Sequence, residues 1–257
     1  MKRVVVTGAS SGIGAQSVRE FVSRGWRVVA VARRSDKLEA LRDETGCDII
    51  VCDITDDSQI AGLARQVEET GGATGLANVA GGALGTERVE EASNDDWRWM
   101  FEVNVLGMRS VTAALLPTLR ASANLYGGST ILNLTSTAGL NAYPGGGGYN
   151  ATKYAAHAVT EVLRLELAGE PIRVMELAPG LVHTEEFTLK RLRGDFEATA
   201  ALYQNVTPLT ASDVANVLVA AFEQPAHVNQ DLIVLRPVAQ SSVFHTHKGE
   251  LRVRNSG

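Results

Sequence analysis

Short apolar runs alternate with longer amphipathic segments along most of the chain. The apolar runs are rich in β-branched residues and predict strands at residues 4–7, 28–32, 49–52, 76–79, 131–134, 173–177 and 232–235. The segments between them have helical spacing and predict helices at residues 12–23, 36–45, 58–69, from 95 onward, 149–167 and 212–223. Because strands alternate with helices, we expect right-handed βαβ units and a single-domain α/β fold with a parallel sheet.

Two further segments bear on the domain organisation. The helix that begins near Asp95 contains Pro117, which we expect to kink it or to divide it, because proline lacks the N–H that a helix uses. The chain is polar from residue 241, where we expect a loosely ordered tail. We therefore predict one domain at residues 1–240 and a tail at residues 241–257.

The composition is that of an ordinary globular protein. Of 257 residues, 45% are hydrophobic and 21% are charged, and the formal net charge is −5. The densest basic patch, residues 190–193, favours a solvated helix face, so we expect no nucleic-acid partner. No apolar run approaches the roughly 18–20 residues of a membrane span, so we expect no membrane partner.

The cysteine pattern argues against a metal site. Cys47 and Cys52 stand too far apart for a CxxC pair and fit no zinc pattern. We expect free thiols, no bound metal and a reducing, cytoplasmic location.

A glycine-rich turn follows the first strand and opens the first helix. Gly8, Gly12 and Gly14 permit a sharp turn and a close approach of the backbone to a pyrophosphate. The helix N-terminus adds free N–H groups and a positive dipole end. The turn predicts a dinucleotide site, with an ordinary connecting loop as the alternative.

The end of the second strand indicates which nicotinamide dinucleotide binds. NAD sites usually place a carboxylate there to hold the ribose 2′-hydroxyl. This chain instead has Arg33 and Arg34, and a guanidinium can bind a 2′-phosphate through two parallel hydrogen bonds. We predict NADP(H) with Arg33 as the main determinant; two solvated arginines at a helix start are the alternative.

Two later strand ends would complete the nucleotide site. Asp53 follows the third strand, where it would bind the adenine amino group or cap the next helix. Asn78, Ala80 and Gly81 end the fourth strand, where a small backbone would line the adenine ribose.

Four polar residues suggest acid–base chemistry on a carbonyl or alcohol. Tyr149 and Lys153 share one face of a predicted helix. A tyrosine hydroxyl can donate or accept a proton if its pKa falls from about 10 toward neutrality, and the Lys153 ammonium would lower it. Ser136 could donate a hydrogen bond to the substrate oxygen, and Asn104 could hold a water that leads toward Lys153. The alternatives are a packing pair and a helix-capping serine.

Together these motifs resemble those of the short-chain dehydrogenase/reductase family, over roughly residues 2–240. The resemblance implies a Rossmann-type, doubly wound, seven-stranded sheet in the order 3-2-1-4-5-6-7. It also implies a catalytic tetrad of Asn104, Ser136, Tyr149 and Lys153, with Lys153 on the nicotinamide ribose and the backbone at Val182 and Thr184 on the carboxamide. Further implied cofactor contacts are Gly8, Ser10, Ser11, Gly12, Ile13, Gly14, Arg34, Ile54, Pro179 and Gly180.

A closer resemblance is to the branch that acts on serine and other 3-hydroxy acids with NADP. It is carried by residues 81–85, 92–97, 179–182 and 225–229 and by Glu186 and Phe187. Residues 183–185 depart from the branch pattern inside the implied substrate loop, residues 183–207. The family also suggests a homotetramer, or a dimer, built on the helices that carry Asn104 and Tyr149.

These observations predict an enzyme that interconverts a small 3-hydroxy acid, or a similar alcohol, and its carbonyl form. Lys190, Arg191 and Arg193 are the candidate partners of a substrate carboxylate. Two alternatives remain: a reductase of a larger ketone or polyketide-like intermediate, and an NADPH-binding protein without turnover.

Overall fold

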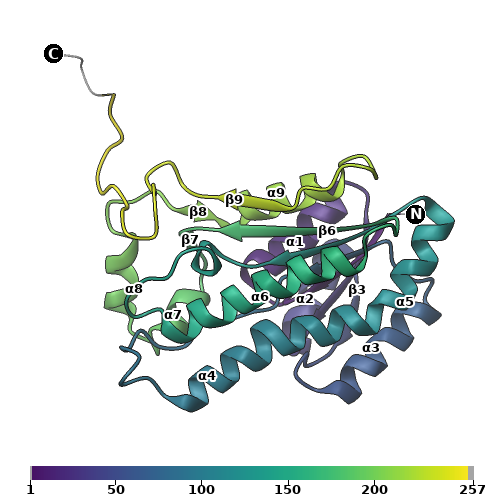
Figure 1. The fold of residues 1–257 in the computed structure, drawn as a ribbon, viewed down its shortest axis with the longest axis horizontal. Coiled ribbons are helices and arrows are strands. Elements are labelled where there is room, and N and C mark those ends of the chain that lie inside the picture. Colours follow the sequence, from purple (N-terminus) through teal and green to yellow (C-terminus); the bar gives the residue numbers. More distant parts are fainter. Residues whose placement is uncertain (1, 254–257) are drawn as a thin grey trace.

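A computed structural model describes residues 2–253 and shows a parallel sheet between two layers of helices (Figure 1). The main sheet has the order β3-β2-β1-β4-β5-β6-β9, and every neighbouring pair is parallel. This confirms the doubly wound, seven-stranded arrangement, with β9 as the seventh strand. The strands are β1 Arg3–Thr7, β2 Arg27–Ala32, β3 Asp48–Val51, β4 Gly75–Asn78, β5 Ser129–Leu134, β6 Ile172–Pro179 and β9 Leu232–Leu235.

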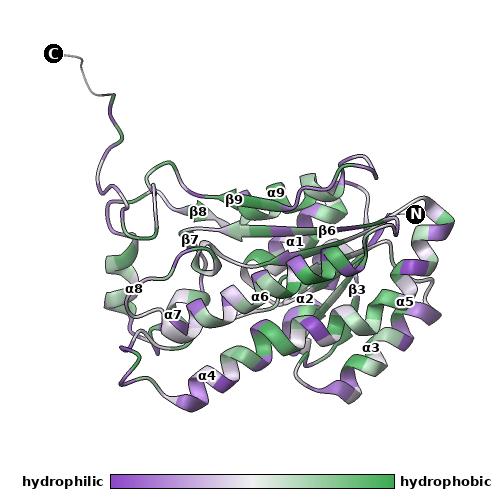
Figure 2. Cartoon of the chain, viewed as in Figure 1, coloured by the Kyte–Doolittle hydropathy of each residue, from purple (hydrophilic) through white to green (hydrophobic). Residues whose placement is uncertain are grey.

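Helices cover both faces of this sheet. One face packs against α1 Gly12–Ser23, α2 Ser35–Thr45 and α9 Ala211–Phe222. The other packs against α3 Asp57–Glu69, α5 Met108–Tyr126 and α6 Gly147–Glu166. Figure 2 shows that hydrophobic and hydrophilic residues alternate along these helices. Outside the two layers lie α4 Asn94–Phe101, α7 Phe187–Arg191 and α8 Phe196–Tyr203, together with a small parallel pair, β7 Val182–His183 and β8 Leu209–Thr210.

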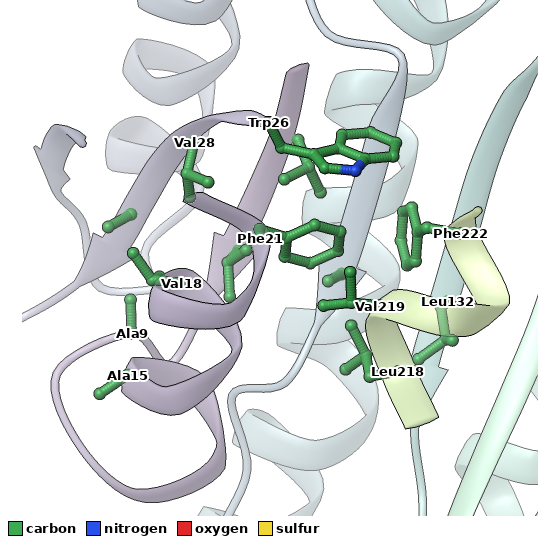
Figure 3. Packing of buried hydrophobic residues seen from close by; sticks show 14 of the residues in the cluster. Ala9, Ala15, Val18, Phe21, Trp26, Val28, Leu132, Leu218, Val219 and Phe222 are labelled. Atoms are coloured by element: carbon green, nitrogen blue, oxygen red, sulfur yellow. The ribbon is translucent and has the colours of Figure 1, made fainter. Parts of the chain in front are cut away.

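Burial on both faces explains why the strands read as continuous apolar runs. Val4 and Val6 of β1 pack toward α1 and α9, whereas Val5 packs toward α3 and α5, and all three are fully buried. On the first face Phe21 and Phe222 meet edge to face, with ring centroids 5.1 Å apart (Figure 3). Each such buried side chain stabilises the fold by about 1.5–3 kcal/mol.

The helix is not divided at Pro117, so that part of the expectation is wrong. The helix α5 runs through Pro117, because Leu115 and Leu119 on either side of it are almost fully buried and hold the helix in the core. The irregularity lies earlier, in a π-helical segment, Glu102–Gly107, between α4 and α5. It carries Asn104, which is 2% exposed. Such wide turns often occur at functional sites.

The start of the C-terminal tail is attached to the domain by backbone hydrogen bonds. The His247 amide donates to the Ala239 carbonyl at 2.8 Å, and the Gly249 amide donates to the Asn205 carbonyl at 2.6 Å. Residues 239–249 therefore lie beside the end of the expected substrate loop. Within residues 2–253, none of the helices has the length and apolar character needed to cross a membrane.

Candidate active site

The strand ends open into one cavity of about 1140 Å³. A parallel sheet places ligands at the carboxyl ends of its strands, as here. The volume exceeds the roughly 300–1,000 Å³ of a pocket for one drug-sized ligand, which leaves room for a cofactor and a small substrate. Of the expected site residues, all but Asn78 and Asn104 line it: Gly8, Ser10, Ser11, Gly12, Ile13, Gly14, Arg33, Arg34, Asp53, Ile54, Ala80, Gly81, Ser136, Tyr149, Lys153, Pro179, Gly180, Val182 and Thr184.

The glycine turn at the start of α1 has no room for side chains. A Cβ on Gly14 would lie 2.1 Å from the Gly8 carbonyl oxygen, and one on Gly8 would lie 2.7 Å from the Ala80 Cα. Ser11 precedes the helix but makes no capping hydrogen bond, and the first turn of α1 has no acidic residue. The start of α1 therefore offers its N–H groups and dipole to an anion, as a pyrophosphate site requires.

Arg34 lies against this turn. Its guanidinium donates to the Ser10 hydroxyl at 3.0 Å and to the Glu186 carboxylate at 2.9 Å. The Arg34 hydrogen bond holds the pKa of Glu186 below its usual range, against the effect of burial. A carboxylate of the substrate loop thus already occupies the anion-binding end of the cavity.

Arg33 and Asp53 lie together at the next strand ends. Their side chains form an ion pair at 3.5 Å, and the Arg33 side chain is 57% exposed. Asp53 accepts hydrogen bonds from the Thr55 amide and hydroxyl, whereas Asp56 caps α3. The alternative of Asp53 as the helix cap is therefore wrong.

Tyr149 and Lys153 stand one turn apart near the start of α6, as expected. The Lys153 ammonium lies 5.8 Å from the Tyr149 ring centroid and donates to the Leu134 carbonyl at 3.1 Å. Burial raises the pKa of Tyr149 to about 12, while Ser136 and Arg191 act in the opposite direction. Burial lowers the pKa of Lys153 to about 8. The protein groups alone thus leave the pKa of Tyr149 raised, rather than lowered by Lys153 as expected.

Ser136 is both a cap and a wall of the cavity. Its hydroxyl accepts from the Ala138 amide at 3.1 Å, at the start of a short 3-10 turn, and donates to the Pro179 carbonyl at 3.3 Å. It lines the same cavity as Tyr149. The long bond to Pro179 leaves the hydroxyl free to turn toward a substrate oxygen.

Asn104 and Asn78 lie behind the cavity wall. The Asn104 amide exchanges two 2.8 Å hydrogen bonds with the Gly82 backbone and donates to the Thr152 hydroxyl at 3.1 Å. The amide thus has protein partners at both of its polar ends. The Asn78 side chain donates to Thr112 and Asn133 inside the protein, outside the cavity lining.

The three candidate cations of the substrate loop lie in different surroundings. The Arg191 guanidinium is 5.3 Å from the Tyr149 ring centroid and lines the cavity. Lys190 also lines the cavity, 4.3 Å from the Trp99 ring centroid. Arg193 lies outside the cavity lining and pairs with Glu87 at 3.2 Å. Arg191 is thus the cation placed beside the expected acid–base residue.

Comparison with known proteins gives the family. A family model described as short chain dehydrogenase matches residues 2–193. The chain belongs to the short-chain dehydrogenase family. An uncharacterized oxidoreductase of Mycobacterium tuberculosis is 47% identical over 242 residues, which cover 94% of this chain and 93% of the relative. Serine 3-dehydrogenase of Agrobacterium fabrum is 38% identical over 241 residues, which cover 93% and 94%. A closed form of serine dehydrogenase complexed with NADP+ has a TM-score of 0.89 and 34% identity, and the match covers 99% of this chain and 100% of that one.

This short-chain dehydrogenase has cavity residues for which the sequence predicted no contact with the site. Tyr143 and Phe187 lie beside Tyr149, and Phe187 meets it edge to face at 5.8 Å. Val243, Thr246 and Lys248 reach the same cavity from the tail, which we expected to be loosely ordered. No local pattern marks these residues, because each contact joins segments far apart in the sequence.

Proposed function

We propose that this short-chain dehydrogenase transfers a hydride between NADP(H) and a small 3-hydroxy acid or its oxo form. The observation that carries the proposal is the Arg191 guanidinium 5.3 Å from the Tyr149 ring, in the cavity that also holds the glycine turn. One cavity thus combines a dinucleotide site, an acid–base residue and a cation for a carboxylate. The resemblance to serine 3-dehydrogenase supports the same substrate class.

The residues present suit NADP(H). The tight turn at Gly14 and the uncapped start of α1 would accept its pyrophosphate. Arg33 and Arg34 would accept the 2′-phosphate, and no carboxylate ends β2 to repel it. Bound NADP(H) supplies or accepts the hydride. The serine dehydrogenase complexed with NADP+ supports this choice of cofactor.

Three residues would handle the proton. Tyr149 would donate it to the carbonyl oxygen during reduction and remove it from the hydroxyl during oxidation. Ser136 would stabilise the charge that develops on the same oxygen. Lys153 would hold the nicotinamide ribose and favour the ionised form of Tyr149. Asn104 would fix the Gly82 backbone, since both polar ends of its amide bind there.

Arg191 would anchor the substrate carboxylate. Its guanidinium has five N–H donors. Three of its hydrogen bonds go to protein oxygens, those of Tyr143 at 3.1 Å and of Gly85 and Gly145 at 3.4 Å. Two N–H groups remain, and a carboxylate accepts two from a guanidinium.

The test is NADP+ reduction by the purified protein with small 3-hydroxy acids and with their methyl esters, which lack the charge. We expect turnover of the acids, weak turnover of the esters, and a preference for NADP+ over NAD+ that Arg33→Ser reduces. Turnover of bulky neutral alcohols alone would refute the 3-hydroxy acid as substrate and favour the reductase of a larger ketone. Tight NADPH binding without any turnover would indicate the binding protein instead.

A further inference from the structure

A row of buried polar side chains crosses the main sheet beneath α6. Asn78, Asn133 and Glu176 stand at matching register positions on β4, β5 and β6, and none is more than 3% exposed. Asn78 donates to Asn133, and Asn133 donates to Thr160 of α6, both at 2.9 Å. Polar groups are seldom buried in a sheet without such partners. The asparagines thus bind one another and α6, although the Asn78 Oδ1 has no partner, and Glu176 is the ionisable member of the row.

The Glu176 carboxylate is completely buried and held at both oxygens. The Thr135 hydroxyl donates to Oε1 at 2.5 Å, and His157 Nδ1 lies 2.7 Å from Oε2. The Thr135 hydroxyl and the His157 ring nitrogen thus fix the position of this carboxylate from two sides. An ionised group at this depth also requires a compensating charge.

His157 supplies such a charge only when it is protonated, and Lys153 is the second cation near this carboxylate. The α6 residues Lys153 and His157 are four apart and share the helix face that meets β6. Lys153 donates to the Leu134 carbonyl, and the next residue, Thr135, donates to Glu176. The cation and the carboxylate thus bind successive residues of one chain segment. The Glu176 charge also counteracts the lowering of the Lys153 pKa by burial.

The remaining charged groups near Glu176 lie at the surface. Glu161 reaches His157 from its outer side at 3.7 Å and is 57% exposed. The Asp231 backbone carbonyl accepts a hydrogen bond from the Glu176 amide. The Asp231 carboxylate is 64% exposed and pairs with Arg164. Water screens these charges. Among the described residues, Lys153 and His157 are therefore the titratable side chains that face Glu176 inside the protein.

We propose that Glu176 is the buried counter-charge that keeps Lys153 protonated. Thr135 and His157 hold its carboxylate in place. Glu176 lies outside the cavity lining, so it is a positioning residue that acts through Lys153 on Tyr149. Its effect on turnover rests on the function proposed above, whereas its effect on the charge of Lys153 does not.

The test measures the charge of Lys153 directly in the full-length protein. Lysine labelled with ¹³C at Cε gives an NMR signal that moves on deprotonation, and the Lys153 signal is the one missing from Lys153→Arg. In Glu176→Gln we expect its midpoint to fall by about one pH unit or more, because a nearby opposite charge is lost. Glu176→Asp, which keeps the charge, should restore most of the shift. Glu161→Gln, which removes the exposed carboxylate on the same histidine, should leave the midpoint unchanged.

An unchanged midpoint in Glu176→Gln would overturn the proposal. If that variant does not fold, Glu176→Met combined with His157→Leu and Thr135→Val removes the carboxylate together with both side chains that bind it, and the same fall is expected. With an active enzyme, the alkaline decline of kcat/KM for carbonyl reduction should move to lower pH in Glu176→Gln. Lower rates with an unmoved profile would show a merely structural role. A fallen midpoint in a protein without any turnover would refute the proposed function and leave the pairing of the two charges standing.

Discussion

Replacing Arg191 with glutamine tests the substrate assignment most directly. The variant loses the charge beside Tyr149 and the N–H groups left for a carboxylate. A hydrogen bond to a charged group is worth about 1.5–3 kcal/mol, which corresponds to roughly 10- to 150-fold in kcat/KM. Because Arg191 is only half-buried, we expect the lower part of this range, about 10- to 50-fold.

The loss must be separated from an effect on Tyr149. The Arg191 charge also counteracts the rise of the Tyr149 pKa that burial causes, so its removal slows every substrate. The ratio of kcat/KM for a hydroxy acid to that for its methyl ester cancels this common effect. Steady-state NADP+ reduction with both compounds therefore gives the contribution of the anchor alone.

A matched control comes from the same loop. Arg193→Gln makes the same chemical change at a residue that lies outside the cavity lining and pairs with Glu87 and Asp96. It should leave the acid-to-ester ratio within about twofold, as expected for an exposed ion pair. An unchanged ratio in Arg191→Gln would refute the role of Arg191 and, with it, the argument for a carboxylate substrate.

Four further changes have defined outcomes. Tyr149→Phe should reduce turnover by about a hundredfold or more and leave NADPH binding, followed by fluorescence, intact; undiminished turnover would contradict the mechanism. Gly14→Ala sets a Cβ 2.1 Å from the Gly8 carbonyl oxygen, so NADPH affinity should fall by about tenfold, and equal affinity would show that the turn adapts. Phe222→Ala should lower the free energy of unfolding in urea by about 3–5 kcal/mol, and a loss below about 1 kcal/mol would show that the core collapses around the cavity. Burial lowers the pKa of Lys153 to about 8, so kcat/KM for reduction should decline as the pH rises through that value and the lysine loses its charge; a flat profile would count against the role of Lys153.

The local pattern of the chain was sufficient for the sheet and for most helices. Strands that are buried on both faces consist mainly of apolar residues, which makes them visible in the sequence. The helix α1 begins and ends at the residues expected. Pro117 led to a wrong expectation of a divided helix. The hydrogen bond that a proline removes from a helix is known from the sequence, whereas the packing of its neighbours in the core depends on distant parts of the chain. The π-helical segment at Glu102–Gly107 leaves no mark in the apolar spacing.

The candidate site divides in the same way. Residues just beyond a strand end, such as Ser136 and Asp53, could be found because parallel strands end at one edge of the sheet. Glu186 bonds to Arg34 across 152 positions of the sequence, and such a contact has no local signature. The hydrogen-bond partners of Asn104 could not be predicted from the sequence either, because they depend on how Gly82 approaches the π-helical segment.

The acid–base pair shows why the surroundings of a motif matter as much as the motif. Burial is the largest effect on both groups: it raises the pKa of Tyr149 and lowers that of Lys153, and so favours the neutral form of each. Each shift is opposed by a group from another element. Ser136 and Arg191 act on Tyr149, and Glu176 acts on Lys153. The Tyr149–Lys153 motif therefore depends on three residues from β6, the substrate loop and the turn after β5 to bring both groups nearer to a working charge state.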